Sequence, residues 1–205
     1  MYIPKSFALT DESEIERIFR EFSFATLVTN DENGLQASHL PFEFDAERNV
    51  LISHMARANP QWRAFQNSET EALVIFQGPH GYISPQWYET ELAVPTWNYV
   101  VVHVYGKPRI VEDDAEVVAL LERLVAANEA QFENPWRLEA PDDWQAKMRR
   151  AIVGIEIPVS RVEAKAKMSQ NRPANDVLGV IEGLEAKGQT ELAKWVQQLN
   201  RTEAA

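Results

Sequence analysis

Phe24-Ala25-Thr26-Leu27-Val28-Thr29 combines aromatic and β-branched residues in a way that is typical of a β-strand. Turn-forming residues follow in Asn30-Asp31-Glu32-Asn33-Gly34, and the next run, from Leu35 to Phe44, predicts a second strand. A connection this short joins antiparallel neighbours, because parallel strands need a much longer crossover. This part of the chain is therefore expected to form a β-hairpin.

Further runs of β-rich sequence predict more strands along the chain. They span residues 50–54, 71–77, 97–111, 151–157 and 161–168. The segment 78–95 contains three prolines and is expected to form a long ordered loop. A loop of that length inside a compact domain is more often functional than idle.

Helical patterns flank these strands. A side chain such as Asp113, with Glu116 three residues later, suits the start of a helix because it accepts hydrogen bonds from the free amides of the first turn. Six or seven short strands with peripheral helices predict an α+β fold with a mainly β core, built as an antiparallel barrel. We expect one domain over residues 1–173 and a C-terminal helical appendage, broken at Gly188, over residues 174–205. The expected helices start at Thr10–Asp11, Pro60, Asp113, Asp142 and Ala174.

The composition excludes several classes of protein and site. The chain has 205 residues, 45% of them hydrophobic, and no cysteine, which excludes disulfides, thiolate metal sites and cysteine nucleophiles. A net charge of −11 argues against a broad contact with DNA phosphates. The first residues lack the apolar region of a signal peptide, and no apolar run approaches the ~20 residues that span a bilayer. We expect a cytoplasmic protein with no membrane partner.

One segment reverses the acidic balance of the chain. Between Lys147 and Arg172 there are seven basic residues and two acidic ones, a local balance of +5. The last part, Lys165-Ala166-Lys167-Met168-Ser169-Gln170-Asn171-Arg172, adds hydroxyl and amide groups to that charge. Such a donor set indicates an anion site, most simply for a phosphate. The alternative is a solvated basic loop.

Two further segments carry candidate binding groups. In Ser53-His54-Met55-Ala56-Arg57-Ala58-Asn59-Pro60-Gln61-Trp62 a predicted strand ends and a helix begins, and free amides there would suit a phosphate. The alternative is a simple connection, with Asn59 as N-cap and Trp62 in the core. The aromatic residues of segments 83–88 and 95–99 can line a pocket for a flat ring, form a dimer interface or pack in the core.

No motif in the sequence indicates a metal or a catalytic triad. The four histidines lack the spacing of a metal site, and hydrogen-bonded structural imidazoles are expected for His39, His54 and His103. Glycine-rich nucleotide-binding motifs and the hydrolase nucleophile motif are absent. The predicted C-terminal helices carry too many acidic residues for a DNA-recognition surface. We therefore assign no catalytic residue from sequence.

Several separated motifs, in order along the chain, resemble the PaiB family of FMN-binding negative transcriptional regulators. The resemblance runs from Met1 to roughly Gly188. Its motifs are Met1-Tyr-Ile-Pro4, His39-Leu-Pro-Phe42, His54-Met-Ala-Arg-Ala-Asn-Pro-Gln-Trp62, Ala72-Leu-Val-Ile-Phe-Gln-Gly78, Tyr82-Ile-Ser-Pro85, Pro95-Thr-Trp-Asn-Tyr99, Ile152-Val-Gly-Ile-Glu-Ile157 and Ser169-Gln-Asn-Arg-Pro173.

This resemblance implies an FMN-binding split β-barrel, usually a homodimer with FMN at the subunit interface. It implies a cofactor site made of two sets of residues, one for the phosphate or ribityl chain and one for the flavin ring. The first set is Arg57, Asn59, Trp62, Lys167, Ser169, Gln170, Asn171 and Arg172. The second set is Thr26, Val28, His39, Trp97 and Asn98.

Two functions follow from the resemblance. The first is a flavin-binding negative regulator of transcription, which the charge of the chain suggests acts through a partner protein or through flavin or redox state instead of direct DNA contact. The second is an FMN-dependent oxidoreductase acting on a small molecule, with His39 or His103 as acid–base candidates. Turnover with a nicotinamide cofactor discriminates between them.

Overall fold

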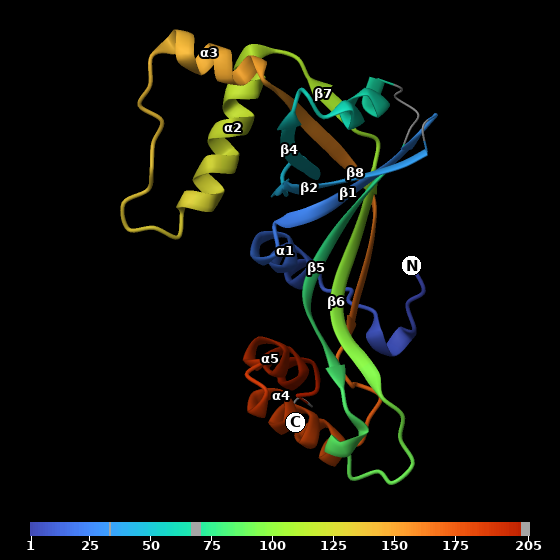
Figure 1. Cartoon of the computed structure of the whole chain (residues 1–205). Coiled ribbons are helices and arrows are strands. Elements are labelled where there is room, and N and C mark those ends of the chain that lie inside the picture. Colours follow the sequence, from blue (N-terminus) through green and yellow to red (C-terminus); the bar gives the residue numbers. More distant parts are fainter. Residues whose placement is uncertain (33, 67–70, 202–205) are drawn as a thin grey trace. The chain divides into compact units, whose positions relative to one another are not determined.

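The computed structural model describes residues 1–32, 34–66 and 71–201 (Figure 1). The strands are β1 Phe24–Asp31, β2 Gly34–Pro41, β3 Glu43–Asp45, β4 Val50–Ala56, β5 Ala72–Ile83, β6 Thr96–Gly106, β7 Arg109–Val111 and β8 Ile152–Lys167. The helices are α1 Glu12–Glu21, α2 Asp114–Glu129, α3 Asp142–Arg150, α4 Ala174–Ala186 and α5 Thr190–Leu199, with 3-10 turns η1 Lys5–Phe7, η2 Pro60–Gln66 and η3 Pro85–Trp87. Within the described ranges, no helix is both long and apolar enough to cross a membrane.

The strands form an antiparallel sheet in the order β2-β1-β5-β6-β8-β4-β3, and β7 pairs with β8. The predicted α+β fold with a mainly β core is confirmed. Contacts divide the chain into two compact units. The first unit contains residues 1–15, 77–102 and 163–205, and the second contains residues 16–76 and 103–162. The expected division into residues 1–173 and 174–205 stays a prediction.

The predicted hairpin of the second unit is confirmed. β1 and β2 pair from Phe24 opposite Pro41 to Asp31 opposite Gly34. Alternate β1 residues are buried, which leaves the face with Thr26 and Val28 only partly covered. The prediction of one strand from Leu35 to Phe44 was wrong, because the chain leaves the sheet at Phe42. This ring is 2% exposed and belongs to the core, so the strand is interrupted between β2 and β3.

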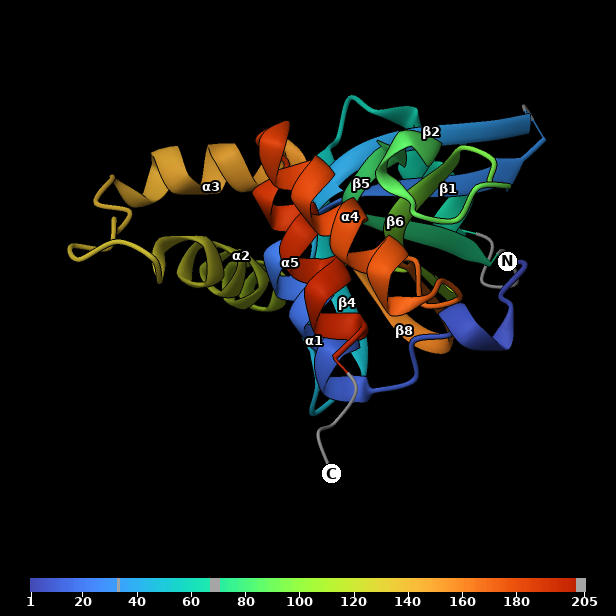
Figure 2. The same cartoon turned by 90° about the horizontal axis from the view of Figure 1, so that it is seen from below.

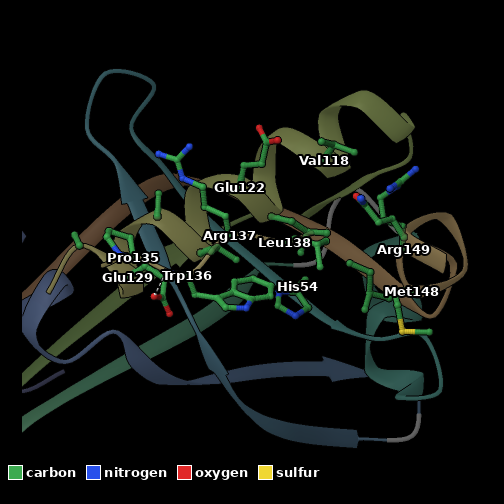
Figure 3. A pocket seen from close by; sticks show the side chains of 16 residues that line it. His54, Val118, Glu122, Glu129, Pro135, Trp136, Arg137, Leu138, Met148 and Arg149 are labelled. Carbon is green, nitrogen blue, oxygen red and sulfur yellow. Dashed lines mark hydrogen bonds between the residues drawn. The ribbon is translucent and has the colours of Figure 1, made fainter. Parts of the chain in front are cut away.

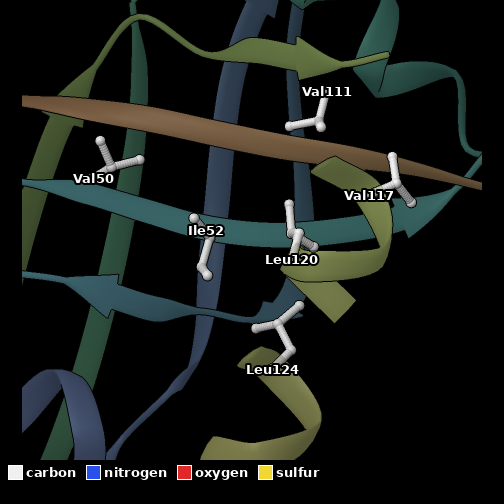
Figure 4. Close-up of a cluster of buried hydrophobic side chains, with 6 residues drawn as sticks. All are labelled: Val50, Ile52, Val111, Val117, Leu120 and Leu124. Atoms are coloured by element: carbon white, nitrogen blue, oxygen red, sulfur yellow. The ribbon is translucent and has the colours of Figure 1, made fainter. Parts of the chain in front are cut away.

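Helix α2 covers one face of β4 in the same unit. Figure 4 shows the buried cluster in which Val50 and Ile52 of β4 meet Leu120 and Leu124 of α2. Asp113 caps the helix as predicted, because its Oδ1 accepts hydrogen bonds from the amides of Ala115 and Glu116 at 2.9 and 3.0 Å. The capped start and the apolar stripe together fix this helix on the sheet.

In the first unit, helices α4 and α5 lie side by side (Figure 2). Two glycines of α4 allow η3 to approach the helix closely. A Cβ atom on Gly179 would lie 1.9 Å from the carbonyl oxygen of Trp87, and one on Gly183 would lie 2.4 Å from the Trp87 ring. The predicted break between the two helices is confirmed at Gly188, whose φ of +73° suits glycine.

Three strand predictions need correction. The loop expected over residues 78–95 is shorter, because β5 continues to Ile83. The single strand expected over residues 97–111 is divided into β6 and β7, since Pro108 cannot donate a ladder hydrogen bond. The two strands expected over residues 151–168 are one long strand, β8.

Candidate functional site

Lys167, at the end of β8 in the first unit, is a half-buried cation with neutral partners. Its Nζ donates a hydrogen bond to the Trp97 carbonyl oxygen at 3.0 Å and another to the Thr96 hydroxyl. Burial, together with the positive charges of Lys165 and Arg172, lowers the pKa of the Lys167 ammonium. An anion bound beside Lys167 would relieve this electrostatic cost.

The two neighbouring cations have few acidic partners. Lys165 is buried, donates a hydrogen bond to the Tyr2 carbonyl oxygen at 3.2 Å, and has its Nζ 5.1 Å from the Tyr99 ring centroid. The Arg172 guanidinium lies 4.3 Å from the Tyr88 ring centroid and 3.8 Å from an oxygen of Asp176. We name Lys165, Lys167 and Arg172 the cation cluster. Asp176 is the carboxylate that pairs with it among the described residues.

Polar side chains beside the cation cluster differ in whether they are available to a ligand. Ser169 adopts a positive φ of +66°, and its Oγ accepts a hydrogen bond from Asn98 Nδ2 at 2.9 Å. The Asn98 Oδ1 atom is enclosed and has no hydrogen-bond partner. The Gln170 side chain is occupied locally, since it bonds the Met168 amide and the Ala166 carbonyl oxygen, each at 2.6 Å.

Two other predicted residues of this unit are exposed. Asn171 is exposed at the turn before α4. The Trp97 side chain is 54% exposed and packs edge-on against Tyr82, with the ring centroids 6.1 Å apart. In the first unit, hydrogen bonds therefore join two pairs of predicted site residues. One pair is Trp97 and Lys167, and the other is Asn98 and Ser169.

The predicted residues of the hairpin lie together in the second unit. Thr26 is directly opposite His39 in the β1–β2 register, and Thr26 Oγ1 lies 3.0 Å from His39 Nδ1. Val28 lies two residues along β1 on the same face. The structural imidazole expected for His39 is confirmed by this hydrogen bond.

Arg57 and Trp62 form a clamp at the end of β4. The Arg57 guanidinium donates hydrogen bonds to the carbonyl oxygens of Arg150 at 2.9 Å and Ile152 at 2.8 Å. The Trp62 indole Nε1 donates to the Arg57 carbonyl oxygen at 3.0 Å, and the guanidinium lies 5.9 Å from the indole ring centroid. These two bonds tie β4 to the start of β8 and use two of the five N–H donors of the Arg57 guanidinium.

Asn59 has the capping role that the sequence left as an alternative. Its Oδ1 accepts a hydrogen bond from the Gln61 amide at 3.0 Å, at the start of η2. Its Nδ2 donates to the Ser38 hydroxyl at 2.8 Å, which links η2 to the hairpin. Asn59 therefore uses both ends of its side-chain amide to connect these elements.

The structure also corrects or extends the expectations for polar side chains. His54 was expected to be hydrogen-bonded, but its Nδ1 is enclosed without a partner.

The sequence analysis missed Asp176, which is 1% exposed. Its side chain accepts hydrogen bonds from the amides of Glu89 and Thr90 at 3.0 and 3.1 Å, and these bonds hold the loop after η3. An Asp in the first turn of a helix looks like a capping residue in sequence, so no signal distinguished it. In the described part of the chain, no group of three or more His, Asp and Glu residues is placed to hold a metal ion.

Comparison with known proteins identifies relatives over most of the chain. Residues 1–161 match the family model described as "Putative FMN-binding domain". The protein named Protease synthase and sporulation protein PAI 2 of Bacillus subtilis is 41% identical over 189 residues, which cover 90% of this chain and 89% of the relative. An uncharacterized protein of Emericella nidulans is 32% identical over 243 residues, which cover 98% of this chain and 96% of the relative.

Solved structures share the fold at low sequence identity. The flavocytochrome Anf3 from Azotobacter vinelandii has a TM-score of 0.64 at 12% identity, and the similarity covers 86% of this chain and 78% of that one. The FAD and heme binding protein from Mycobacterium smegmatis has a TM-score of 0.62 at 16% identity, covering 83% of this chain and 78% of that one. At these identities the similarity concerns the fold alone.

Proposed function

We propose that this chain, which belongs to the PaiB-type family of FMN-binding split barrels, is a flavin-binding negative regulator of transcription that works as a homodimer. FMN is the cofactor of this domain. When bound, FMN supplies reversible redox chemistry, which lets a protein respond to the redox state around it. The relative from Bacillus subtilis is named for protease synthesis and sporulation, and this name supports a regulatory role over a metabolic one.

The cation cluster is the observation that carries the proposal. The donors fit a phosphate group, because Lys167 and Arg172 supply positive charge and Asp176 is the carboxylate paired with them in the described part of the chain. Asn98 adds an enclosed polar atom without a partner, as expected beside a ligand. We assign the phosphate to Lys167 and Arg172. The roles expected for Thr26, Val28 and His39 at the flavin ring, and for Arg57, Asn59 and Trp62, stay predictions.

Regulation through a partner protein fits the charge of the molecule better than direct DNA contact. The chain has a net charge of −11, and DNA binding depends on neutralising phosphates with Lys and Arg. Helix α5 contains one lysine and one glutamate, so it offers no basic stripe for a DNA groove. Steeply salt-dependent retention of operator DNA by the purified protein would contradict this part of the proposal.

The cofactor assignment is tested by titrating the purified protein with FMN while flavin fluorescence is recorded. We expect saturable binding, weakened about 10- to 100-fold in Lys167→Gln, because a charged hydrogen bond is worth about 1.5–3 kcal/mol. The matched control is Lys194→Gln, an exposed lysine of α5 whose loss should leave the affinity unchanged. Equal weakening in both variants, or none in Lys167→Gln, would contradict the assignment.

The regulatory role is tested by adding NADH or NADPH to the FMN-bound protein and following the flavin absorbance. We expect slow reduction without repeated turnover. Fast reduction over many turnovers would contradict the proposal and favour an FMN-dependent oxidoreductase.

A further inference from the structure

A cavity of about 680 Å³ opens in the second unit, beside the apolar cluster under α2. Its walls come from α2, from residues 135–138, from α3 and from the strands β4 and β8. The apolar part of the lining includes Val118, Leu121, Val125, Trp136, Leu138 and Met148. A volume in this range is typical of pockets that bind a small organic molecule, and this one is open, since Trp136 and Met148 in its wall are 55% and 40% exposed.

His54 lines the cavity from the sheet side (Figure 3). Alternation along β4 directs Val50, Ile52 and His54 to the same face. Side chains of α2 cover Val50 and Ile52, whereas His54 lines the cavity.

The His54 imidazole is an unsatisfied polar group in an apolar setting. Nδ1 is enclosed and has no hydrogen-bond partner, whereas Nε2 is not among the enclosed atoms without a partner. Burial lowers the pKa of His54, so the ring is neutral at neutral pH. A neutral imidazole offers one donor and one acceptor. Because Nδ1 is enclosed, Nε2 is the ring nitrogen to which a ligand hydroxyl can bond.

The charges around the cavity balance one another. Two carboxylates, Glu122 and Glu129, and two guanidinium groups, Arg137 and Arg149, contribute to its lining. Glu129 accepts a hydrogen bond from the Trp136 amide at 2.7 Å, and Arg149 forms a salt bridge with Asp114. With no excess of either sign, the cavity favours an uncharged ligand.

We propose that this cavity is a second binding site, for an uncharged ligand of two or three fused rings that carries a hydroxyl group. The rings pack between Trp136 and Met148, where an indole and a flexible thioether supply polarizable contact. The hydroxyl bonds to the His54 imidazole and gives orientation. The site uses none of the residues assigned to FMN.

The test is equilibrium dialysis of the full chain against 2-naphthol, with and without saturating FMN. Naphthalene, which lacks the hydroxyl, is the comparison compound. We expect one saturable site per chain that prefers 2-naphthol over naphthalene by about 3- to 10-fold, the range of one neutral hydrogen bond. His54→Leu should abolish this preference and keep naphthalene binding, which shows that the variant is folded.

A matched pair of variants places the site on α2. Ala126 lines the cavity and its exposed neighbour Ala127 does not, so Ala126→Trp should fill the cavity and block 2-naphthol, while Ala127→Trp should not. Equal binding in both variants would overturn the proposal. Displacement of 2-naphthol by FMN would also overturn the proposal, because it would place 2-naphthol in the flavin site. Absent binding, with an oligomeric state changed by Ala126→Trp, would identify an interface between copies instead.

The inference does not depend on FMN binding. The dialysis is also run without FMN, so binding of 2-naphthol can be measured even if the chain does not bind FMN.

Discussion

Asp176 is the residue whose loss is expected to have the clearest effect on stability. Burial alone raises its pKa, but hydrogen bonds from Thr90 and Glu89 and the charge of Arg172 outweigh burial and hold the pKa below its ordinary value. Asp176→Asn removes the charge and replaces Oδ2, the oxygen that accepts the 2.8 Å hydrogen bond from the Thr90 hydroxyl. We expect the melting temperature at pH 7 to fall by about 3–8 °C.

The pH dependence of that loss has a definite sign. A carboxyl whose pKa is lower in the folded than in the unfolded chain stabilises the fold above the unfolded pKa, which is ~3.9 for Asp. That stability is lost as the pH falls through the folded value. The difference between the wild type and Asp176→Asn should therefore narrow below about pH 4, as measured by thermal melts. Asp143→Asn, at an exposed position of α3, is the control, and an equal loss there would contradict the argument.

At the scale of the element, α4 carries a prediction that reverses an ordinary rule. Replacing a glycine inside a helix by alanine normally stabilises it by roughly 1 kcal/mol. A Cβ on Gly179 would meet the Trp87 carbonyl oxygen at 1.9 Å, so Gly179→Ala must displace η3 or the helix. We expect it to lower the melting temperature, whereas Leu178→Ala, at an adjacent position that is 58% exposed, should change it little. A rise in Gly179→Ala would show that η3 moves freely.

Elements were predictable from sequence where the signal is local. The hairpin, the Asp113 cap and the Gly188 break follow from turn, capping and glycine chemistry, and each is confirmed. The continuity of β8 was missed, because the polar residues after Ile157 weaken the strand pattern although the backbone pairing continues. At the site, charge counting indicated the basic segment. It did not reveal that the side chains of Gln170 and Arg57 donate hydrogen bonds to backbone carbonyl oxygens.

At the scale of the whole molecule, the last prediction concerns the proposed homodimer. β2 is an edge strand, and the hairpin exposes Phe24 at 68% and Leu35 at 78%. Exposed apolar side chains beside an unpaired edge are a surface that a second copy can cover. Light scattering should therefore give twice the chain mass of 23.4 kDa. Phe24→Glu should shift the protein toward one chain by placing a charge in that interface. Leu92→Glu, at a position that is 93% exposed, should leave the dimer intact. A wild-type mass of one chain would refute the homodimer. An unchanged dimer in Phe24→Glu would place the interface elsewhere.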